Sequence, residues 1–194
     1  MIRRAAMMRG KALAIAALVI AGVGITASAL WIPAKAALGQ HLLESAWQRA
    51  QTGEGDSRPW DWADIRPIAR LHAPRLGQSQ IVLDQASGEA MAWGPGYVQG
   101  TAPLGAPGLS AAAAHRDTHF AFLKDLEIGD VLELETADGR RLKYQVRESR
   151  VVDSRLWTFP IERDGPDVLA LATCWPFDVL EPGPERFILF ADRI

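Results

Sequence analysis

The residue with the most distinctive chemistry in this chain of 194 residues is its single cysteine, Cys174. A lone thiol cannot form an internal disulfide, and it excludes a metal or redox site of the CxxC type, because each of these needs a second cysteine. Three interpretations remain: an inert buried thiol, an attachment point for a lipid or another chain, and a catalytic nucleophile. Free cysteines often act as small core hydrophobes, so the neighbouring sequence has to decide between them.

Two further residues are placed so that strand pairing could bring them to Cys174. Cys174 ends an apolar run that begins at Val168, and the following Trp and Pro turn the chain out of a strand there. Arg186 begins the next apolar run, across a loop rich in Pro and Gly, so two antiparallel strands would place it beside Cys174. His115 directly follows another apolar run, 109–114, at the exit of a strand.

A thiol, an imidazole and a guanidinium at one edge of a sheet can carry out acyl transfer. The thiolate is the nucleophile. The imidazole of His115 exchanges protons near neutral pH, so it can protonate a leaving amine and then deprotonate the incoming nucleophile. The guanidinium of Arg186 is cationic and has several N–H donors, which can bind the oxyanion or orient the scissile carbonyl.

Other polar residues are interpreted as structural. His115 and His119 are four residues apart, as in some zinc sites, but the stretch lacks an HExxH pattern, and we expect no metal or other cofactor. His119 is expected to form a hydrogen bond in a loop. Arg116 is expected either to contact substrate or to form a surface ion pair, for example with Asp117 or Asp125. The formal charge of −2 gives no reason to expect a nucleic-acid partner.

The N-terminal region predicts a membrane anchor. Residues 12–32 carry no charge, and a helix of that length is about 30 Å long, which matches the hydrocarbon core of a bilayer. Basic residues are concentrated before this run, so the positive-inside rule predicts a single-pass protein of the inner membrane with a cytoplasmic N-terminus and a periplasmic domain. The sequence Ala27-Ser28-Ala29 leaves open the alternative of a cleaved signal peptide.

We expect three regions: a basic N-terminus with the anchor over 1–33, an amphipathic helix and linker over 34–59, and a catalytic domain over 60–194. Pro33 suits the first turn of the second helix, and Leu38 and Leu42 begin an apolar face with a spacing of four residues. The favoured interpretation of this helix is a stalk that packs loosely on the domain.

Short apolar runs separated by Gly and Pro predict a mostly β fold. Alternating residues over 131–136 and 141–147, joined by a turn at 137–139, predict a hairpin. A helical turn is expected within 118–126, and further strands are expected at 68–72, 79–84, 90–93, 109–114, 150–153, 168–173 and 186–191. About eight short strands with little helix indicate a closed or nearly closed β-barrel.

Three segments resemble the signature segments of the sortases, namely AHRDTHF at 114–120, LATC at 171–174 and RFILFA at 186–191. They occur in the family's order and at similar spacing, and the similarity extends over roughly residues 66–194. The whole chain, including its anchor, most resembles the sortases of Gram-negative bacteria, class GN. The resemblance implies a closed eight-stranded barrel with short helices. It also implies a cysteine transpeptidase that cuts the C-terminal sorting signal of an exported protein through a thioester and passes the acyl group to an amine.

Carried over residue by residue, the resemblance implies a catalytic triad of His115, Cys174 and Arg186. Thr173 would line the site beside the nucleophile. Trp157 would belong to an apolar wall of the substrate groove, and Trp175 would contact substrate, shield the thiol or cap the core. Ala114 departs from the glycine that many sortases have before the histidine, so the loop is expected to differ slightly there.

Two alternative functions stay open at this point. L,D-transpeptidases of peptidoglycan also combine Cys, His and Arg, but they usually have a Ser-x-Gly-Cys segment with the histidine close by, whereas Ala-Thr-Cys occurs here. The second alternative is an anchored, non-catalytic binding barrel with an inert cysteine. Thiol reactivity separates an enzyme from the binding barrel. A core thiol reacts only on unfolding, whereas a catalytic Cys174 reacts in the folded state with a pH profile coupled to His115.

Overall fold

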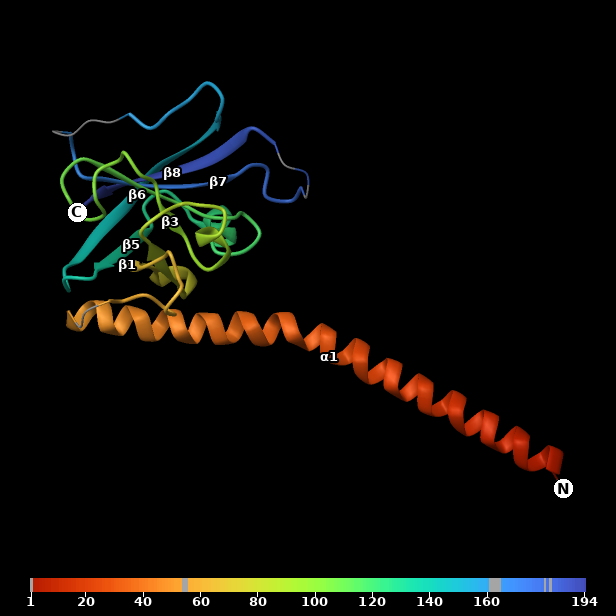
Figure 1. Ribbon diagram of the computed structural model, residues 1–194. Helices are drawn as coiled ribbons and strands as arrows, with labels where there is room; N and C mark the ends of the chain where they lie inside the picture. The colour runs from red at the N-terminus through yellow and green to blue at the C-terminus, as the bar shows by residue number, and fades with distance from the viewer. Residues whose placement is uncertain (1, 54–55, 161–164, 180, 182) are drawn as a thin grey trace. The chain divides into compact units, whose positions relative to one another are not determined.

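The computed structural model describes residues 2–53, 56–160, 165–179, 181 and 183–194 (Figure 1). One long helix precedes eight strands and three short 3-10 turns. In chain order the elements are α1 (Ile2–Thr52), β1 (Pro67–Ala73), η1 (Pro74–Leu76), β2 (Gln78–Leu83), η2 (Ala90–Ala92), β3 (Gly96–Tyr97), β4 (Leu109–Ala113), η3 (Ala121–Asp125), β5 (Val131–Thr136), β6 (Arg141–Asp153), β7 (Val168–Cys174) and β8 (Glu185–Arg193).

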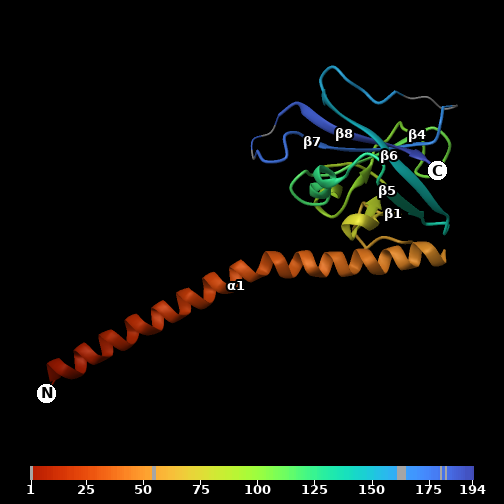
Figure 2. The same ribbon diagram turned by 180° about the vertical axis from the view of Figure 1, so that it is seen from behind.

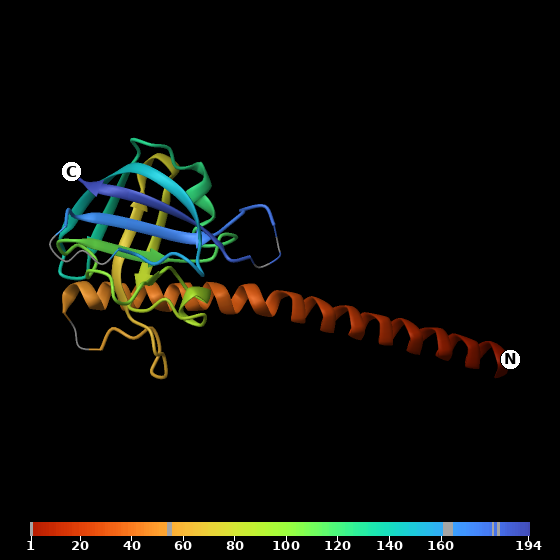
Figure 3. The ribbon, with the colours of Figure 1, turned by 90° about the horizontal axis from the view of Figure 1, so that it is seen from above.

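The strands close into a barrel in the order β1-β2-β3-β4-β7-β8-β6-β5, which confirms the predicted fold class. Most neighbours are antiparallel, as in the predicted hairpin of β5 and β6, while β4 and β7 pair in parallel. The long strand β6 runs beside β8, as seen from the front in Figure 1 and from behind in Figure 2. In Figure 3, β4 (green), β7 and β8 (both blue) lie side by side; the site described below is at one end of these three strands.

The core of the barrel follows from the alternation of side chains along its strands. In β5 and β6 the buried positions alternate with less buried ones, so that Leu132, Leu134 and Tyr144 point inward while charged residues between them face out. Each of these three inward side chains is at most 1% exposed. This interior fixes the register of the strands, because a slip of one residue would turn the apolar side chains out.

Strand β7 is buried on both faces over Val168–Thr173, and the middle residues of its neighbours β4 and β8 are buried in the same way. Leu169 and Leu171 belong to the interior of the barrel, whereas Ala170 and Ala172 belong to a second apolar cluster on the outside. The outer cluster also contains Trp157 and Phe159 from the segment between β6 and β7, although each is only partly buried. Since side chains alternate along a strand, Cys174 falls on the same outer face as Ala172, and Thr173 falls on the inner one.

The structure corrects the predicted organisation of the N-terminal helices. One helix runs from Ile2 to Thr52 with Pro33 inside it, so no new helix begins at Pro33. The chain divides into two structural units, the first ending at Gln40 and the second spanning His41–Ile194, so the last turns of α1 group with the barrel. The predicted domain boundaries at 33 and 59 stay predictions.

The end of α1 packs tightly on the barrel, contrary to the loose stalk that was expected. Leu43, Ala46 and Trp47 are between 0% and 1% exposed, and Leu43 packs in a cluster with Leu83 of β2. Trp47 also lies under the guanidinium of Arg70, which is 5.4 Å from the centre of its ring. The predicted face of Leu38, Leu42, Ala46 and Ala50 is therefore right for Ala46, but the large apolar side chains that pack are Leu43 and Trp47.

The strand predicted between β2 and β4 also needs correction. Residues 90–93 were expected to form a strand, but Ala90–Ala92 forms a 3-10 turn and the strand β3 follows at Gly96–Tyr97. The backbone passes so closely at Gly96 that a Cβ atom there would lie 2.1 Å from the carbonyl oxygen of Gln85. Only glycine fits this approach, which lets β3 join β2 to β4.

The N-terminal helix is long and apolar enough to cross a membrane, in the part of α1 that begins at Leu18. Large apolar side chains there are exposed, and Ile20 and Ile25 are each 72% exposed. A single N-terminal helix of this kind is compatible with a single-pass anchor, and a signal sequence would have the same length and composition.

Candidate active site

Strand pairing brings Cys174 and Arg186 together. Cys174 is the last residue of β7, Arg186 is the second residue of β8, and the two are direct partners in the antiparallel register. Both strands therefore contribute one of the predicted functional side chains at the same edge of the barrel. This is the proximity expected from the short loop between the two apolar runs.

His115 reaches the same edge through the parallel pairing of β4 with β7. The register pairs Ala113 with Ala172, and the N–H of Ala114 donates to the carbonyl of Ala172 at 3.2 Å. Because parallel strands point the same way, the chain leaves β4 at the level where β7 approaches Cys174. His115 is exposed, and its carbonyl accepts a hydrogen bond from the N–H of Phe120 at 3.1 Å, which closes the loop after it.

One cavity of about 300 Å³ is lined by all three of these residues. Its lining also includes Thr173 and Trp157, as predicted, with Ala172 and Ile188 among the apolar walls. Alanine at this place leaves room on the outer face of β7, while the larger side chains close the sides. The result is a mostly apolar recess with a thiol, an imidazole and a guanidinium at its rim.

Thr173 connects the strand of the cysteine to the loop of the histidine. Its side chain is 2% exposed, and its hydroxyl donates to the carbonyl of Ala114 at 2.7 Å. Ala114 is the residue at which the sequence departs from the glycine of many sortases, and it is buried. The bond from Thr173 therefore anchors the backbone just before His115, while a contact of Thr173 with substrate stays a prediction.

Backbone carbonyls near the start of β8 hold the guanidinium of Arg186. Its Nη1 donates to the carbonyl of Gly183 at 2.7 Å and to that of Glu185 at 2.8 Å. Asp153 lies near it, and its pKa is lowered to about 2, mainly by the hydrogen bond from the Arg155 side chain, with a smaller contribution from the charge of Arg186. Because Arg155 is the main partner of this carboxylate, Arg186 keeps donors for a ligand in the cavity.

His119 is a loop histidine with a hydrogen bond, as expected. Its Nδ1 lies 3.0 Å from the amide oxygen of Gln80. Burial lowers the pKa of His119; a hydrogen bond to the backbone of Ala92 raises it, and the neighbouring His115 lowers it further. His119 is therefore harder to protonate than a free histidine, and it is not among the residues that line the cavity. Among the residues that the structure describes, no cluster of three or more His, Cys, Asp or Glu could hold a metal ion.

The two tryptophans that were predicted to bind substrate differ in position. Trp157 lines the cavity and contacts Phe159 edge to face, with ring centres 4.9 Å apart. Trp175 is not among the described residues that line the cavity. Its ring stacks on that of Phe187 and contacts Phe177 edge to face. Since Phe177 and Phe187 pack on the barrel interior, Trp175 caps the core, and its contact with substrate stays a prediction.

Sequence reasoning missed several residues of the cavity, among them Met91 and Val152. Met91 lines it from the turn η2, and Val152 lines it from the far end of β6. Met91 occurs in a run that was interpreted as a strand, and no motif marks it. Val152 could have been found only from the pairing of β6 with β8, which places it opposite Arg186.

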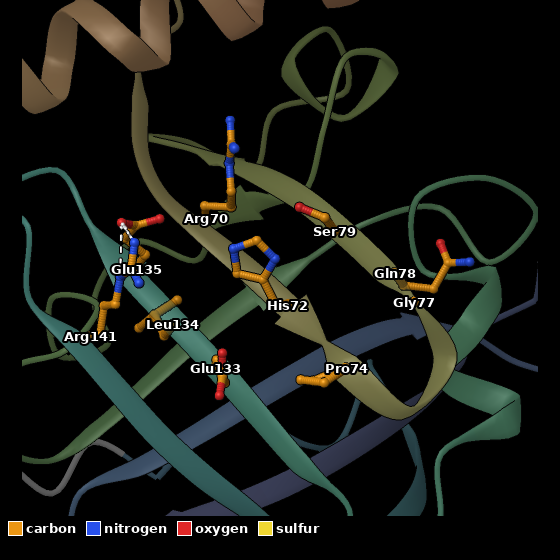
Figure 4. A pocket seen from close by; sticks show the side chains of 10 residues that line it. All are labelled: Arg70, His72, Pro74, Gly77, Gln78, Ser79, Glu133, Leu134, Glu135 and Arg141. Atoms are coloured by element: carbon orange, nitrogen blue, oxygen red, sulfur yellow. Dashed lines mark hydrogen bonds and ion pairs between the residues drawn. The ribbon is translucent and has the colours of Figure 1, made fainter.

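A larger cavity, of about 590 Å³, lies over the outer face of β1, β2 and β5 (Figure 4). Its charged side chains already have partners: Arg141 contacts Glu135 at 3.1 Å, and Arg70 contacts Glu44 at 2.5 Å. His72 projects from β1 between them (Figure 4). No thiol lines this cavity, so the candidate chemistry belongs to the smaller one.

The sequence matches the family model described as "Sortase domain" over residues 71–194, which is more than half of the chain. Among curated proteins it is similar to Sortase D of Bacillus subtilis (strain 168), with 24% identity over 124 residues. The aligned part covers 64% of this chain and 62% of the relative, so the chain spans less than two thirds of the length of that relative.

Solved structures share the fold. Sortase A from Corynebacterium diphtheriae superposes with a TM-score of 0.61 at 20% identity, covering 81% of this chain and 85% of that one. Sortase C-1 from Actinomyces oris superposes with a TM-score of 0.55 at 27% identity, covering 68% and 74% of the two chains. The barrel therefore has the fold of these solved structures.

Proposed function

Because the chain belongs to the sortase family, whose members are cysteine transpeptidases acting on exported proteins with sorting signals, we propose that it is a transpeptidase with Cys174 as its nucleophile. The observation that carries the proposal is the meeting of Cys174, Arg186 and His115 in one cavity at the edge of β7 and β8. Three groups from separate parts of the sequence converge there, and each has a type that acyl transfer needs.

In the first half of the proposed reaction, the thiolate of Cys174 attacks the carbonyl carbon of the scissile amide. The carbonyl oxygen gains the negative charge, and the guanidinium of Arg186 donates to it. Protonated His115 gives its proton to the amide nitrogen, the C–N bond breaks, and the C-terminal peptide leaves as an amine. The acyl group stays on the sulfur as a thioester.

In the second half, an amine replaces the departed peptide. Neutral His115 removes a proton from the amine, whose nitrogen attacks the thioester carbonyl while Arg186 again stabilises the oxyanion. The C–S bond breaks, the thiolate of Cys174 is restored, and a new amide forms. Water in place of the amine would give hydrolysis by the same steps.

The shape of the cavity supports a peptide as the acyl donor. Small residues line the cavity, including Ala172 of β7, and Trp157 adds a flat aromatic side chain. This mostly apolar slot suits an extended chain with apolar side chains. We propose that the sorting signal of an exported protein lies in this slot with its scissile carbonyl at Cys174.

We further propose that residues 12–32 anchor the protein in the inner membrane, with the N-terminus in the cytoplasm and the barrel outside. The single long apolar helix and the basic residues before it support this orientation. Membership of the Gram-negative class GN rests on the sequence resemblance alone, and the relatives reported above lend it no support.

The experiment that tests the proposal is cleavage of a panel of fluorescent sorting-signal peptides that vary around a threonine. Cys174→Ala and His115→Ala should abolish cleavage while circular dichroism and thermal unfolding stay unchanged. His41→Ala, which replaces an exposed histidine of α1, is the matched control and should cleave like the wild type. Full activity in Cys174→Ala would sink the proposal.

A further inference from the structure

We propose that Arg116 is a positioning residue that holds the imidazole of His115 opposite the thiol of Cys174. The inference rests on the proposed function, because the two side chains have to act together only in that reaction. Arg116 directly follows His115 in the chain, and its own side chain extends away from the cavity lining to a second loop. It therefore acts on the reaction through its neighbour.

The second loop is the one that follows Cys174. The Nη1 atom of Arg116 donates to the carbonyl of Pro176 at 2.8 Å, and its Nη2 atom donates to the carbonyl of Glu181 at 2.9 Å. Pro176 is two residues beyond the cysteine, and both carbonyls belong to the connection between β7 and β8. One guanidinium thus cross-links the loop that carries the imidazole to the loop that begins at the thiol.

The cross-link is placed where the strand pairing has ended. Pairing of β4 with β7 stops at Ala113 and Ala172, and the bond from Thr173 to the carbonyl of Ala114 extends it by one residue. Beyond Ala114, and within the part of the chain that the structure describes, Arg116 makes the next hydrogen bonds between the two segments. His115 is exposed and lies in the chain between Ala114, which Thr173 binds, and Arg116, so its position depends on both sets of hydrogen bonds.

The geometry requires arginine and not merely a positive charge. A guanidinium has donors on two nitrogens in a fixed plane, so it can bind two carbonyls that are five residues apart in the loop, whereas a lysine ammonium is a single point on a flexible chain. The ion pairs expected for Arg116 with Asp117 or Asp125 do not occur among the described salt bridges. Both hydrogen bonds of the Arg116 guanidinium fork are with neutral backbone carbonyls, so its role is to hold the backbone of the loop in place.

The test compares Arg116→Lys and Arg116→Ala with Arg141→Ala. Arg141 is a matched control, because its side chain is 81% exposed and contacts Glu135 on another part of the barrel. The first readout is hydrogen exchange of residues 175–179, measured by mass spectrometry. Loss of the fork should speed this exchange by about tenfold in both Arg116 variants, and the control should exchange like the wild type.

The second readout is the rate at which iodoacetamide alkylates Cys174 as a function of pH. Since the chain has one cysteine, every adduct reports on this site. The other charged or ionisable groups beside the pair are His119, Asp153 and Arg186, and all of them remain in each variant. Because Arg116→Lys also keeps the positive charge at position 116, a change of the profile in that variant reports a change in how His115 faces the thiol.

We expect both Arg116 variants to show the profile of His115→Ala, and their kcat for peptide cleavage to fall about tenfold or more with KM unchanged. A wild-type profile in Arg116→Lys would overturn the role of the fork, since charge alone would then suffice. If His115→Ala changes the profile but Arg116→Ala does not, the positioning role fails while the proposed function stands. If His115→Ala itself leaves the profile unchanged, both fail together.

Discussion

At the scale of single residues, Cys174 is notable because it occupies the end of a strand whose six preceding residues are all buried. Ala172, two residues earlier on the same face, is 8% exposed, while Cys174 is more exposed and lines the cavity. An inert core thiol would be expected further inside β7. The end of the strand instead places the sulfur where a substrate can reach it and where Arg186 stands directly opposite.

Replacement of Arg186 tests the second member of the triad. Arg186→Gln removes the charge that would stabilise the oxyanion, so kcat should fall about 100- to 1000-fold, as for the loss of an oxyanion donor. Arg186→Lys keeps the charge but loses the planar fork, so its kcat should lie between those of the wild type and Arg186→Gln. Single-turnover cleavage measures both rates. Equal rates in all three proteins would show that Arg186 takes no part in the reaction.

His119 makes a prediction about the dependence of stability on pH. Its pKa is lowered in the folded state, mainly by burial, so the unfolded state binds a proton more readily than the folded one. The contribution of His119 to stability is therefore present above the unfolded pKa of about 6.5 and is lost as the pH falls from there through the folded pKa.

Urea unfolding of the wild type and of His119→Gln between pH 5 and pH 7.5 tests this directly. The wild type should lose more unfolding free energy than the variant as the pH falls, so the gap between them should change with pH. Carboxylates such as Asp130 and Asp138 have lowered pKa values and titrate below this window in both proteins. If the unfolding free energies of the two proteins changed equally with pH, His119 would not be the group responsible for the loss of stability.

At the scale of elements, local sequence patterns predicted most strands of the barrel, but they did not predict the pairing of strands that are far apart in the sequence. The alternation of β5 and β6 and the turn at Gly139, whose φ is 82°, are local signals, and so is the short loop that brings Arg186 to Cys174. In contrast, the parallel pairing of β4 with β7 joins segments about sixty residues apart, and no local pattern gives its register. The sequence therefore predicted His115 at the exit of a strand, whereas the pairing that brings this strand beside β7 was visible only in the structure.

The same limit explains the errors. Residues 90–93 are apolar and short, and such a run fits a strand and a 3-10 turn equally well until its neighbours are known. Met91 of the cavity was missed for this reason. Pro33 is tolerated inside α1 although proline favours a first turn, and the packing face of α1 was misjudged because Trp47 was not given its weight.

The end of α1 makes a prediction about stability. Trp47 is 1% exposed and contacts Arg70, so Trp47→Ala should lower the free energy of unfolding by about 3–5 kcal/mol. Leu38→Ala is the control, because Leu38 belongs to the face that the sequence predicted to pack and yet is 59% exposed. Its free energy of unfolding should change by less than about 0.5 kcal/mol. If urea titrations gave the same change in the free energy of unfolding for both variants, the helix would pack only loosely on the barrel, as the sequence suggested.

The outer face of β7 makes a prediction about substrate binding. Ala172→Leu adds three carbons to the wall of a cavity of about 300 Å³, so it should raise KM for peptide cleavage by about tenfold or more. Alkylation of Cys174 by the much smaller iodoacetamide should continue at a similar rate. An unchanged KM in Ala172→Leu would show that the peptide binds elsewhere, while loss of both activities would indicate a collapsed site.

At the scale of the whole molecule, an apolar helix precedes the proposed acyl-transfer site in the chain. Because Cys174 is the only thiol, a membrane-impermeant maleimide reports on which side of the inner membrane the barrel lies. Labelling should occur in spheroplasts without lysis, as the positive-inside rule predicts. Labelling only after lysis would reverse the orientation. The intact mass of the same protein tells a retained anchor from cleavage after Ala29.

The most direct test of the proposed reaction is to capture its covalent intermediate by intact-protein mass spectrometry. Wild-type protein mixed with a sorting-signal peptide should gain the mass of the acyl fragment on Cys174, and an added amine should remove that mass and appear in a new amide product. Cys174→Ala should gain none, and Arg116→Ala should gain it more slowly. If the wild type forms no adduct with peptides that it cleaves, or if Cys174→Ala forms the same adduct, Cys174 is not the nucleophile.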